Sequence, residues 1–183
     1  MKVIPTRIPE VLLLELASFP DERGFFMETW NRERYEIPGM PDNFVQDNVS
    51  RSGRGVLRGL HFQSPNGQGK LVTALVGSVF DVAVDLRRDS STFRSWVGVD
   101  LSADNHRQMY VPEGFAHGFV VTSDAALVSY KCTRSYSPEH ERILRWSDPE
   151  VAVDWPVAEP ILSLKDAAAP LLSEIDDGLL FHR

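Results

Sequence analysis

Apolar and polar residues alternate along much of the chain in short runs, which is the pattern of β-strands with one face in a core. In residues 79–86, VFDVAVDL, every second residue counted from Phe80 is large and apolar. The residues between them are aspartate or alanine. One face of this strand is therefore predicted to enter the core, and the other to be polar or to line a cavity.

Similar runs are separated by turn residues about every dozen positions, whereas helical periodicity is nearly absent. A tight hairpin is predicted at Gly77-Ser78, a turn at residues 19–24, a brief helix at 31–35 and helix-like composition at 163–174, where Pro170 limits regularity. Many short strands favour a β-sandwich or small barrel. With no internal repeat or linker, residues 1–183 are expected to form one domain. The predicted strands are residues 11–16, 56–62, 70–76, 79–86, 95–101, 108–111, 118–122 and 127–132, with a further strand expected at Asn48 and Val49.

Composition narrows the class of protein. The formal net charge of -7 at pH 7 argues against nucleic-acid binding, which favours a basic face. Cys132 is the single cysteine, so no intramolecular disulfide can form, and it is typical of a small buried strand residue in a reducing compartment. The opening apolar run is short and is interrupted by Glu15, which predicts neither a signal peptide nor a membrane span. A cytoplasmic protein is expected.

Candidate chemistry gathers in residues 46–70, QDNVSRSGRGVLRGLHFQSPNGQGK, where arginines, amides, a histidine and a lysine surround an apolar strand. Burying such side chains costs free energy unless each finds a partner, so the pattern indicates a lined cavity. Strict alternation would place Arg58 and His61 on opposite faces of the strand. A bulge at Gly59 would bring both onto one face.

Six motifs of the chain, found in order between about residues 23 and 166, are QDN, LRGLHFQ, GKLV, VPEGFAHGF, YKCTRSYSPEHER and LSLKDAAAP. Together they resemble those of the dTDP-4-dehydrorhamnose 3,5-epimerases, cupin-like enzymes of the dTDP-L-rhamnose pathway. The resemblance implies an all-β cupin-type jelly roll with a few short helices. It implies epimerisation of carbons 3 and 5 of dTDP-4-keto-6-deoxyglucose without a cofactor. It also implies a homodimer formed by exchange of N-terminal strands, for which residues 11–14 offer an apolar segment.

Inverting a carbon beside a ketone requires a base, a group that stabilises the enolate oxygen, and an acid on the opposite face. The resemblance assigns these roles to His61, Lys70 and Tyr130, with Asp166 holding the histidine tautomer. Local sequence alone favours other interpretations. Ser163 and Asp166 are typical of a helix-capping box, and Lys70 of a solvated lysine at the start of a strand.

The resemblance also implies a set of substrate-binding residues. Arginine and lysine suit a diphosphate, aromatic rings suit the thymine base, and Glu28 would accept the thymine imide proton. Without the resemblance, Arg23 and Glu28 suggest a surface ion pair, and residues 139–142 suggest a solvated charged turn. The set is Arg23, Phe26, Glu28, Gln46, Asn48, Arg58, His117, Tyr136, Glu141 and Lys165.

One position departs from the family. Val49 stands where the family often has histidine. Because Val49 alternates with Asn48 along a predicted strand, it is expected to face away from the sugar and to affect catalysis little.

Three other functions remain open. An epimerase that inverts only one carbon would use the same His61 and Tyr130. A metal-dependent cupin would use His61 and His117 as ligands, but Phe62-Gln63 follows His61 where such sites usually show a second histidine and a glutamate. A non-catalytic sugar-nucleotide-binding module would not require a base opposite an acid.

Overall fold

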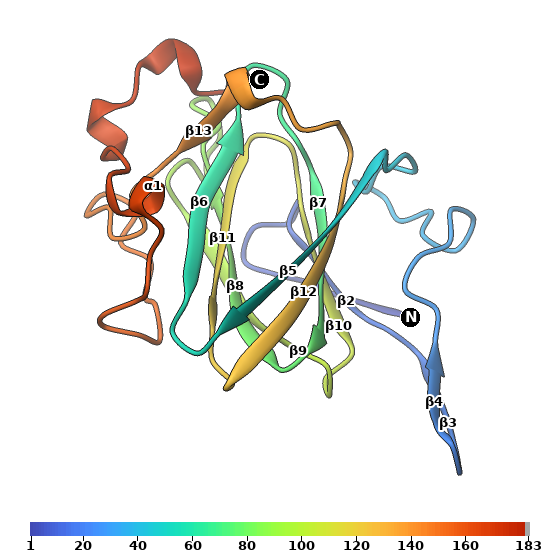
Figure 1. The fold of residues 1–183 in the computed structure, drawn as a ribbon. Coiled ribbons are helices and arrows are strands. Elements are labelled where there is room, and N and C mark those ends of the chain that lie inside the picture. Colours follow the sequence, from blue (N-terminus) through green and yellow to red (C-terminus); the bar gives the residue numbers. More distant parts are fainter. Residues whose placement is uncertain (182–183) are drawn as a thin grey trace.

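Two antiparallel β-sheets face each other and form the jelly roll of the cupin type that was expected (Figure 1). The computed structural model describes residues 1–181. One sheet contains, in spatial order, β1 (Lys2–Ile4), β2 (Leu12–Glu15), β10 (Arg107–Val111), β7 (Lys70–Val76), β12 (Ala125–Cys132) and β5 (Gln46–Gly53). The other contains β13 (Glu141–Ile143), β6 (Leu57–Gln63), β11 (Phe115–Val121), β8 (Ser78–Asp85) and β9 (Trp96–Ser102).

The alternation predicted for β8 is confirmed. Val79 and Ala83 point between the two sheets, into a core that also holds Val72 and Val128 from the facing sheet. The alternate residues, from Phe80 to Leu86, pack on the outer face of their sheet. The inner face thus carries Asp81 within the sandwich, where its carboxylate is fully buried.

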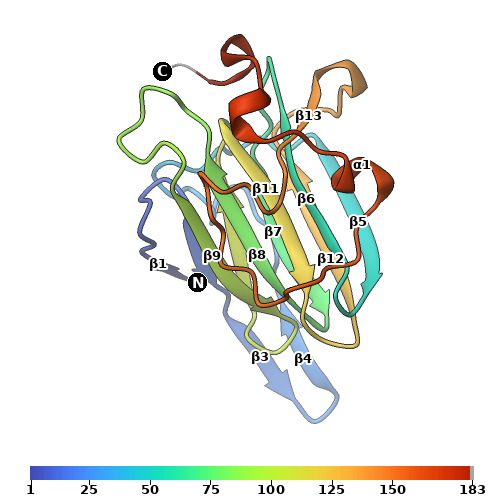
Figure 2. The same cartoon turned by 90° about the vertical axis from the view of Figure 1, so that its left-hand side faces the viewer.

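The segment that follows β13, from Leu144 onward, covers that outer face, and Figure 2 shows it in orange to red across the sheet. Leu144, Val151, Trp155 and Leu172 bury their side chains there. The helix-like segment predicted at 163–174 forms only two short turns, separated by Pro170. The helices are η1 (Pro138–His140), α1 (Leu164–Ala167), η2 (Leu172–Glu174) and η3 (Asp177–Leu179).

The prediction of a hairpin at Gly77-Ser78 is wrong. β7 and β8 belong to different sheets, so the chain crosses the sandwich at this corner. Gly77 has φ +71°, and a Cβ atom there would lie 2.0 Å from the carbonyl oxygen of Ala125. A glycine between two alternating runs marks a sharp turn, but the runs do not say with which strands they pair.

The structure also corrects two other local predictions. The turn expected at residues 19–24 is confined to Glu22 and Arg23, which connect the paired strands β3 (Ser18–Asp21) and β4 (Gly24–Met27). The brief helix expected at 31–35 is a turn, because its one helical bond runs from Tyr35 N–H to the Asn31 carbonyl. This segment is ordered by packing instead, since the Tyr35 side chain is buried on the outer face of the six-stranded sheet.

No helix in residues 1–181 is long and apolar enough to cross a bilayer.

Asp148 is expected to secure the C-terminal cover of the five-stranded sheet. Its buried carboxylate accepts hydrogen bonds from the backbone N–H groups of Glu150, Val151 and Leu172, at 2.9, 3.0 and 2.7 Å. Asp148→Ala leaves these three N–H groups without a hydrogen-bond acceptor. The free energy of unfolding, measured by denaturant titration, should therefore fall by about 3 kcal/mol. The exposed Asp154→Ala serves as the control, and equal stability of the two variants would contradict the role of Asp148.

Candidate active site

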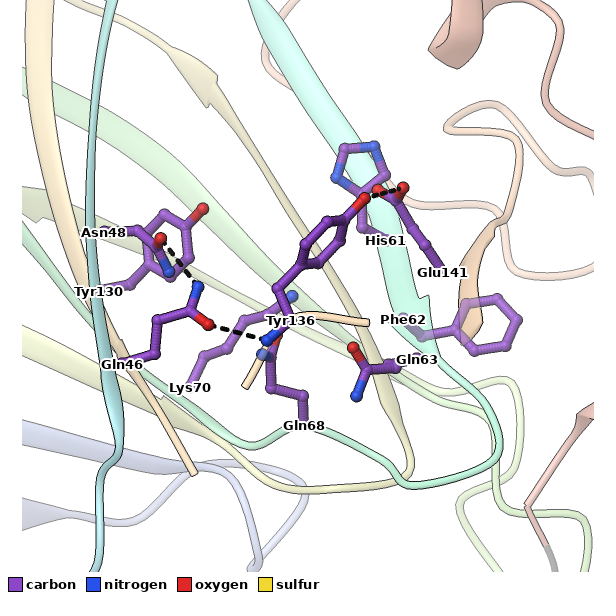
Figure 3. Close-up of a pocket in the computed structure, with 10 residues that line it drawn as sticks. All are labelled: Gln46, Asn48, His61, Phe62, Gln63, Gln68, Lys70, Tyr130, Tyr136 and Glu141. Carbon is purple, nitrogen blue, oxygen red and sulfur yellow. Dashed lines mark hydrogen bonds between the residues drawn. The ribbon is translucent and has the colours of Figure 1, made fainter. Parts of the chain in front are cut away.

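A pocket of about 300 Å³ opens at one end of the sandwich, between the two sheets (Figure 3). Side chains from both sheets and from the segment before β13 form its walls. The lining residues are Gln46, Asn48, His61, Phe62, Gln63, Gln68, Lys70, Tyr130, Tyr136 and Glu141.

A bulge in β6 sets the direction of its polar side chains, as predicted. His61 and Arg58 lie opposite His117 and Phe119 of β11, so three steps along β6 match two along β11. The extra residue falls at Gly59, which has φ +132° and approaches β11 so closely that a Cβ would lie 2.6 Å from Gly118 Cα. As a result, Arg58 and His61 share the inner face of the sheet.

Arg58 reaches the neighbouring sheet from this face. Its Nε donates a 2.9 Å hydrogen bond to the hydroxyl of Ser52 on β5. The guanidinium also acts electrostatically on Tyr130, although Arg58 itself is exposed and lies outside the pocket lining. Arg58 therefore provides a positive charge beside the pocket.

His61 is held by Asp166, a residue more than a hundred positions away in the sequence. The imidazole Nε2 lies 2.6 Å from Asp166 Oδ1. Burial alone would raise the pKa of the Asp166 carboxyl, but the hydrogen bond from His61 and that from Ser163 keep it below its usual value. Since Nε2 faces the carboxylate, Nδ1 is the nitrogen left to exchange a proton with a ligand.

The helix start next to Asp166 is capped by Ser163, as its local sequence indicates, but the Asp166 carboxylate binds the Ser163 hydroxyl and not a backbone amide. The Asp166 backbone N–H donates to the Ser163 hydroxyl at 3.1 Å, and that hydroxyl donates to Asp166 Oδ2 at 2.9 Å. One carboxyl oxygen therefore serves the helix start while the other serves His61. The cap fixes the carboxylate that orients the histidine.

Lys70 lies at the bottom of the pocket with only 9% of its surface exposed. Among residues 1–181 its ammonium has no hydrogen-bond or ion-pair partner, so the solvated lysine favoured by the local sequence is not observed. Burial lowers the pKa of Lys70, while Cys132 and the carboxylates of Asp81 and Glu141 oppose that effect. An unpartnered cation in a pocket wall can stabilise an oxyanion.

His117 sits behind the pocket wall and does not line it. It lies next to His61 across the β6–β11 pair, and its Nε2 is 2.8 Å from Asp81 Oδ1. Desolvation lowers the pKa of His117, although Asp81 acts in the opposite direction. The other oxygen of Asp81 is buried and has no hydrogen-bond partner among the described residues.

Tyr130 faces His61 from the opposite sheet. It lies on β12 beside Asn48 of β5, and Figure 3 shows these two on one wall of the pocket and His61 with Glu141 on the other. Burial raises the pKa of the Tyr130 phenol, so the hydroxyl stays protonated at neutral pH. The pocket thus has an imidazole and a proton-bearing phenol on facing walls.

Hydrogen bonds link four residues along the rim of the pocket, namely Gln46, Tyr136, Glu141 and Lys165. The Tyr136 hydroxyl donates to Glu141 Oε2 at 2.8 Å, and the Lys165 ammonium pairs with the same oxygen. The Tyr136 backbone N–H donates to Gln46 at 2.7 Å. Glu141 is therefore part of the pocket wall and not of a solvated turn.

Three lining residues were absent from the predicted site: Phe62, Gln63 and Gln68. The two amides brace the loops of the rim. Gln63 accepts from Ser137 N–H at 3.0 Å, and Gln68 donates to the Arg134 carbonyl at 2.7 Å. Both glutamines belong to the polar stretch that signalled the cavity, but sequence alone does not distinguish a brace from a ligand contact.

The structure does not bring Arg23, Phe26 and Glu28 to this pocket. They belong to the β3–β4 hairpin or follow it directly, and the hairpin projects away from the body of the protein (Figure 1). Arg23 pairs with Asp21, and Glu28 pairs with Arg34, so both form surface ion pairs but not with each other. The Phe26 side chain is exposed.

Val49 faces away from the pocket, as predicted. Gln46 and Asn48 of the same strand line the cavity, whereas Val49 is 62% exposed on the other face of the sheet.

The arrangement around the two histidines does not favour a metal centre. His61 and His117 each bind a separate aspartate. Within the described part of the chain, no group of three or more histidine, cysteine, aspartate or glutamate residues is placed to hold a metal ion.

Comparison with known proteins agrees with this geometry. A family model described as dTDP-4-dehydrorhamnose 3,5-epimerase matches residues 5–174. The chain is 54% identical over 178 residues to the dTDP-4-dehydrorhamnose 3,5-epimerase of Pseudomonas aeruginosa, covering 96% of this chain and 98% of that protein. It is 42% identical over 183 residues to the dTDP-4-dehydrorhamnose 3-epimerase of Streptomyces niveus, covering 98% and 88%.

Among solved structures, a dTDP-6-deoxy-D-glucose-3,5-epimerase from Legionella pneumophila Philadelphia 1 is similar over the whole chain. That protein was crystallised in complex with dTDP-4-keto-L-rhamnose. The TM-score is 0.96 at 54% identity, and the match covers 100% of this chain and 98% of that chain.

Gly59 is expected to tolerate no side chain, because the bulge brings the two backbones together. Gly59→Ala should lower the free energy of unfolding by about 3 kcal/mol, since it combines a left-handed φ with overpacking. Gly55→Ala is the control, because Gly55 has φ +77° in open space, and it should cost about 1 kcal/mol. If denaturant titrations gave equal losses for the two variants, the close approach to Gly118 would not be what requires glycine.

Proposed function

This chain belongs to the dTDP-4-dehydrorhamnose 3,5-epimerase family, and on that premise we propose that it epimerises carbons 3 and 5 of dTDP-4-keto-6-deoxyglucose to give dTDP-4-dehydro-L-rhamnose. The observation that carries the proposal is the placement of His61 and Tyr130 on facing sheets across one pocket, with the unpartnered Lys70 beside them. Residues 1–183 would act as one catalytic domain.

In the proposed mechanism His61 Nδ1 removes the proton from a carbon adjacent to the ketone. The C–H electron pair forms the enolate double bond, and the carbonyl π electrons move onto oxygen. Lys70 stabilises that oxygen, which could lower the barrier by about 3 kcal/mol if it acts like other oxyanion-hole donors. Tyr130 then donates its proton to the opposite face of the carbon, while Asp166 stabilises the imidazolium. The imidazolium then releases its proton to solvent and the phenolate takes one up, which restores both groups before the second carbon reacts.

The nucleotide end of the substrate requires cations, since the chain as a whole is acidic. Arg58 and Lys165 flank the two sides of the pocket, and each is exposed enough to meet a diphosphate. Gln46 and Asn48 line the wall next to Tyr130 and offer amide hydrogen bonds. No cofactor takes part in this mechanism.

We infer a cytoplasmic homodimer in which the hairpin of one protomer completes the pocket of the other. Arg23, Phe26 and Glu28 lie outside the pocket of their own protomer, although the family resemblance assigns them to substrate binding. The hairpin also exposes three aromatic rings, those of Phe19, Phe25 and Phe26, at 61%, 57% and 68%. Exposed apolar surface of this kind is typical of an interaction site. The free thiol of Cys132 fits a reducing compartment.

The first test is deuterium incorporation, followed by NMR, into dTDP-4-keto-6-deoxyglucose in heavy water containing EDTA. The wild-type protein should label carbons 3 and 5. His61→Ala should lose labelling by about 10³-fold because it removes the base, whereas Tyr130→Phe should still exchange protons on the base side yet form inverted product about 10²-fold more slowly.

Label at one carbon only would identify a single-carbon epimerase, as the named activity of the Streptomyces niveus relative suggests. A requirement for added metal would overturn the cofactor-free mechanism. Tight substrate binding with no label at either carbon would indicate a binding module instead of an enzyme.

The shared pocket is tested by subunit complementation. A variant carrying Arg23→Ala and Phe26→Ala has an intact pocket but a defective hairpin, and His61→Ala has the reverse. Each should be nearly inactive alone. After unfolding and refolding as an equal mixture, half of the dimers are mixed and hold one working site each, so about a quarter of wild-type activity should return.

The matched control mixes His61→Ala with Tyr130→Phe. Both changes damage the same pocket, so mixed dimers contain no intact site and no activity should return. Absence of recovery in the first mixture, or a 20.6 kDa monomer in sizing chromatography at micromolar concentration, would contradict the shared site.

A further inference from the structure

A single carboxylate oxygen at the rim of the pocket accepts two donors of different kinds. Glu141 Oε2 receives the Tyr136 hydroxyl at 2.8 Å and pairs with the Lys165 ammonium. Burial raises the pKa of Glu141, but Lys165 and Tyr136 outweigh that effect and hold it below its usual value. The carboxylate is therefore charged, and its charge is divided between a cation and a phenol.

The two donors to Glu141, Tyr136 and Lys165, differ in the contacts that hold the rest of each residue in place. The Tyr136 backbone is fixed by its bond to Gln46, whereas its hydroxyl makes a bond only to Glu141 among the described residues. Lys165 lies on α1 next to Asp166, and its side chain is half exposed. An anion at the pocket mouth can thus draw Lys165 away, while Tyr136 stays within reach of Glu141.

The charge on Glu141 determines how Tyr136 responds to the departure of Lys165. A carboxylate that has lost its cation is a stronger acceptor, and hydrogen bonds to a charged acceptor are the stronger ones. The bond from Tyr136 should tighten, fixing a ring that is otherwise 51% exposed. Figure 3 shows this ring reaching across the pocket with its hydroxyl toward Glu141 and His61.

We propose that Glu141 is a positioning residue that couples capture of a diphosphate by Lys165 to the fixing of Tyr136 across the pocket. The inference rests on the proposed function, because it takes the ligand to be a sugar nucleotide. The diphosphate end of the substrate would then order the pocket before the sugar reacts.

Fluorine NMR tests this coupling directly, because the chain contains only four tyrosines. The protein is labelled with 3-fluorotyrosine, and the Tyr136 resonance is assigned with Tyr136→Phe. Inorganic pyrophosphate is the probe, since it has neither a base to stack on Tyr136 nor a sugar to fill the pocket. Pyrophosphate should shift the Tyr136 resonance in the wild-type protein, and calorimetry should report its affinity.

Two variants test separately the binding of pyrophosphate by Lys165 and the effect of Glu141 on Tyr136. Lys165→Met should bind pyrophosphate about tenfold more weakly, the scale of one charge-assisted hydrogen bond, and should lose the shift. Glu141→Gln should bind pyrophosphate at least as tightly as wild type, because Lys165 no longer gives up a carboxylate, and yet the shift should disappear. Loss of affinity in Glu141→Gln would overturn the proposal.

The exposed Glu139→Gln, two positions before Glu141, is the matched control and should respond like the wild type. A Tyr136 resonance that does not move although pyrophosphate binds would overturn the coupling, as would failure of pyrophosphate to bind. These outcomes are independent of the deuterium experiment. An enzyme that labels its substrate but shows no pyrophosphate-dependent shift retains the proposed function without this coupling.

Discussion

The close backbone contact between Gly59 and Gly118 determines where the chemistry of this protein can lie. An alternating strand would send Arg58 and His61 to opposite faces, one of them into the apolar layer beneath the C-terminal segment. The bulge instead leaves Leu57 and Leu60 together on that outer layer and frees the inner face for polar groups. A residue with a side chain at position 59 would force the two strands apart. The site therefore depends on glycine at position 59, which has no Cβ atom to separate the two backbones.

Polar side chains inside a sandwich must be paired or must face a cavity, and the two histidines show both solutions. His117 is buried and bound to Asp81 behind the wall of the pocket. His61 makes an equivalent bond to Asp166, but its side chain is 31% exposed and opens to the pocket. The same pair of residue types thus gives a buried structural contact in β11 and, in the neighbouring strand β6, the side chain that we propose as the base. The two histidines differ in how far the imidazole ring is exposed to solvent.

Sequence patterns predicted most strands of the two large sheets, the polar inner face of β8 and the bulge, because each follows from residues near one another in the chain. They missed the short strands β1, β3, β4 and β13. They failed at Gly77, where alternation on both sides marks two strands without saying that these lie in different sheets. They also left Asp166 undecided between a cap and a partner for His61. The structure shows that the carboxyl group binds both His61 and the hydroxyl of the capping residue Ser163, which no local pattern could reveal, since the histidine lies on a distant strand.

The hairpin residues illustrate a second limit of local reasoning. The family resemblance assigns Arg23 and Phe26 to substrate binding, yet within one chain they lie on a projecting hairpin. A folded domain gains nothing by exposing aromatic rings to water, because burying each would be favourable. Their exposure is therefore best explained by a surface that another molecule covers. In the proposed homodimer, the exposed hairpin of each protomer would cover the open pocket of the other, so that one symmetric contact buries the aromatic rings and completes both pockets.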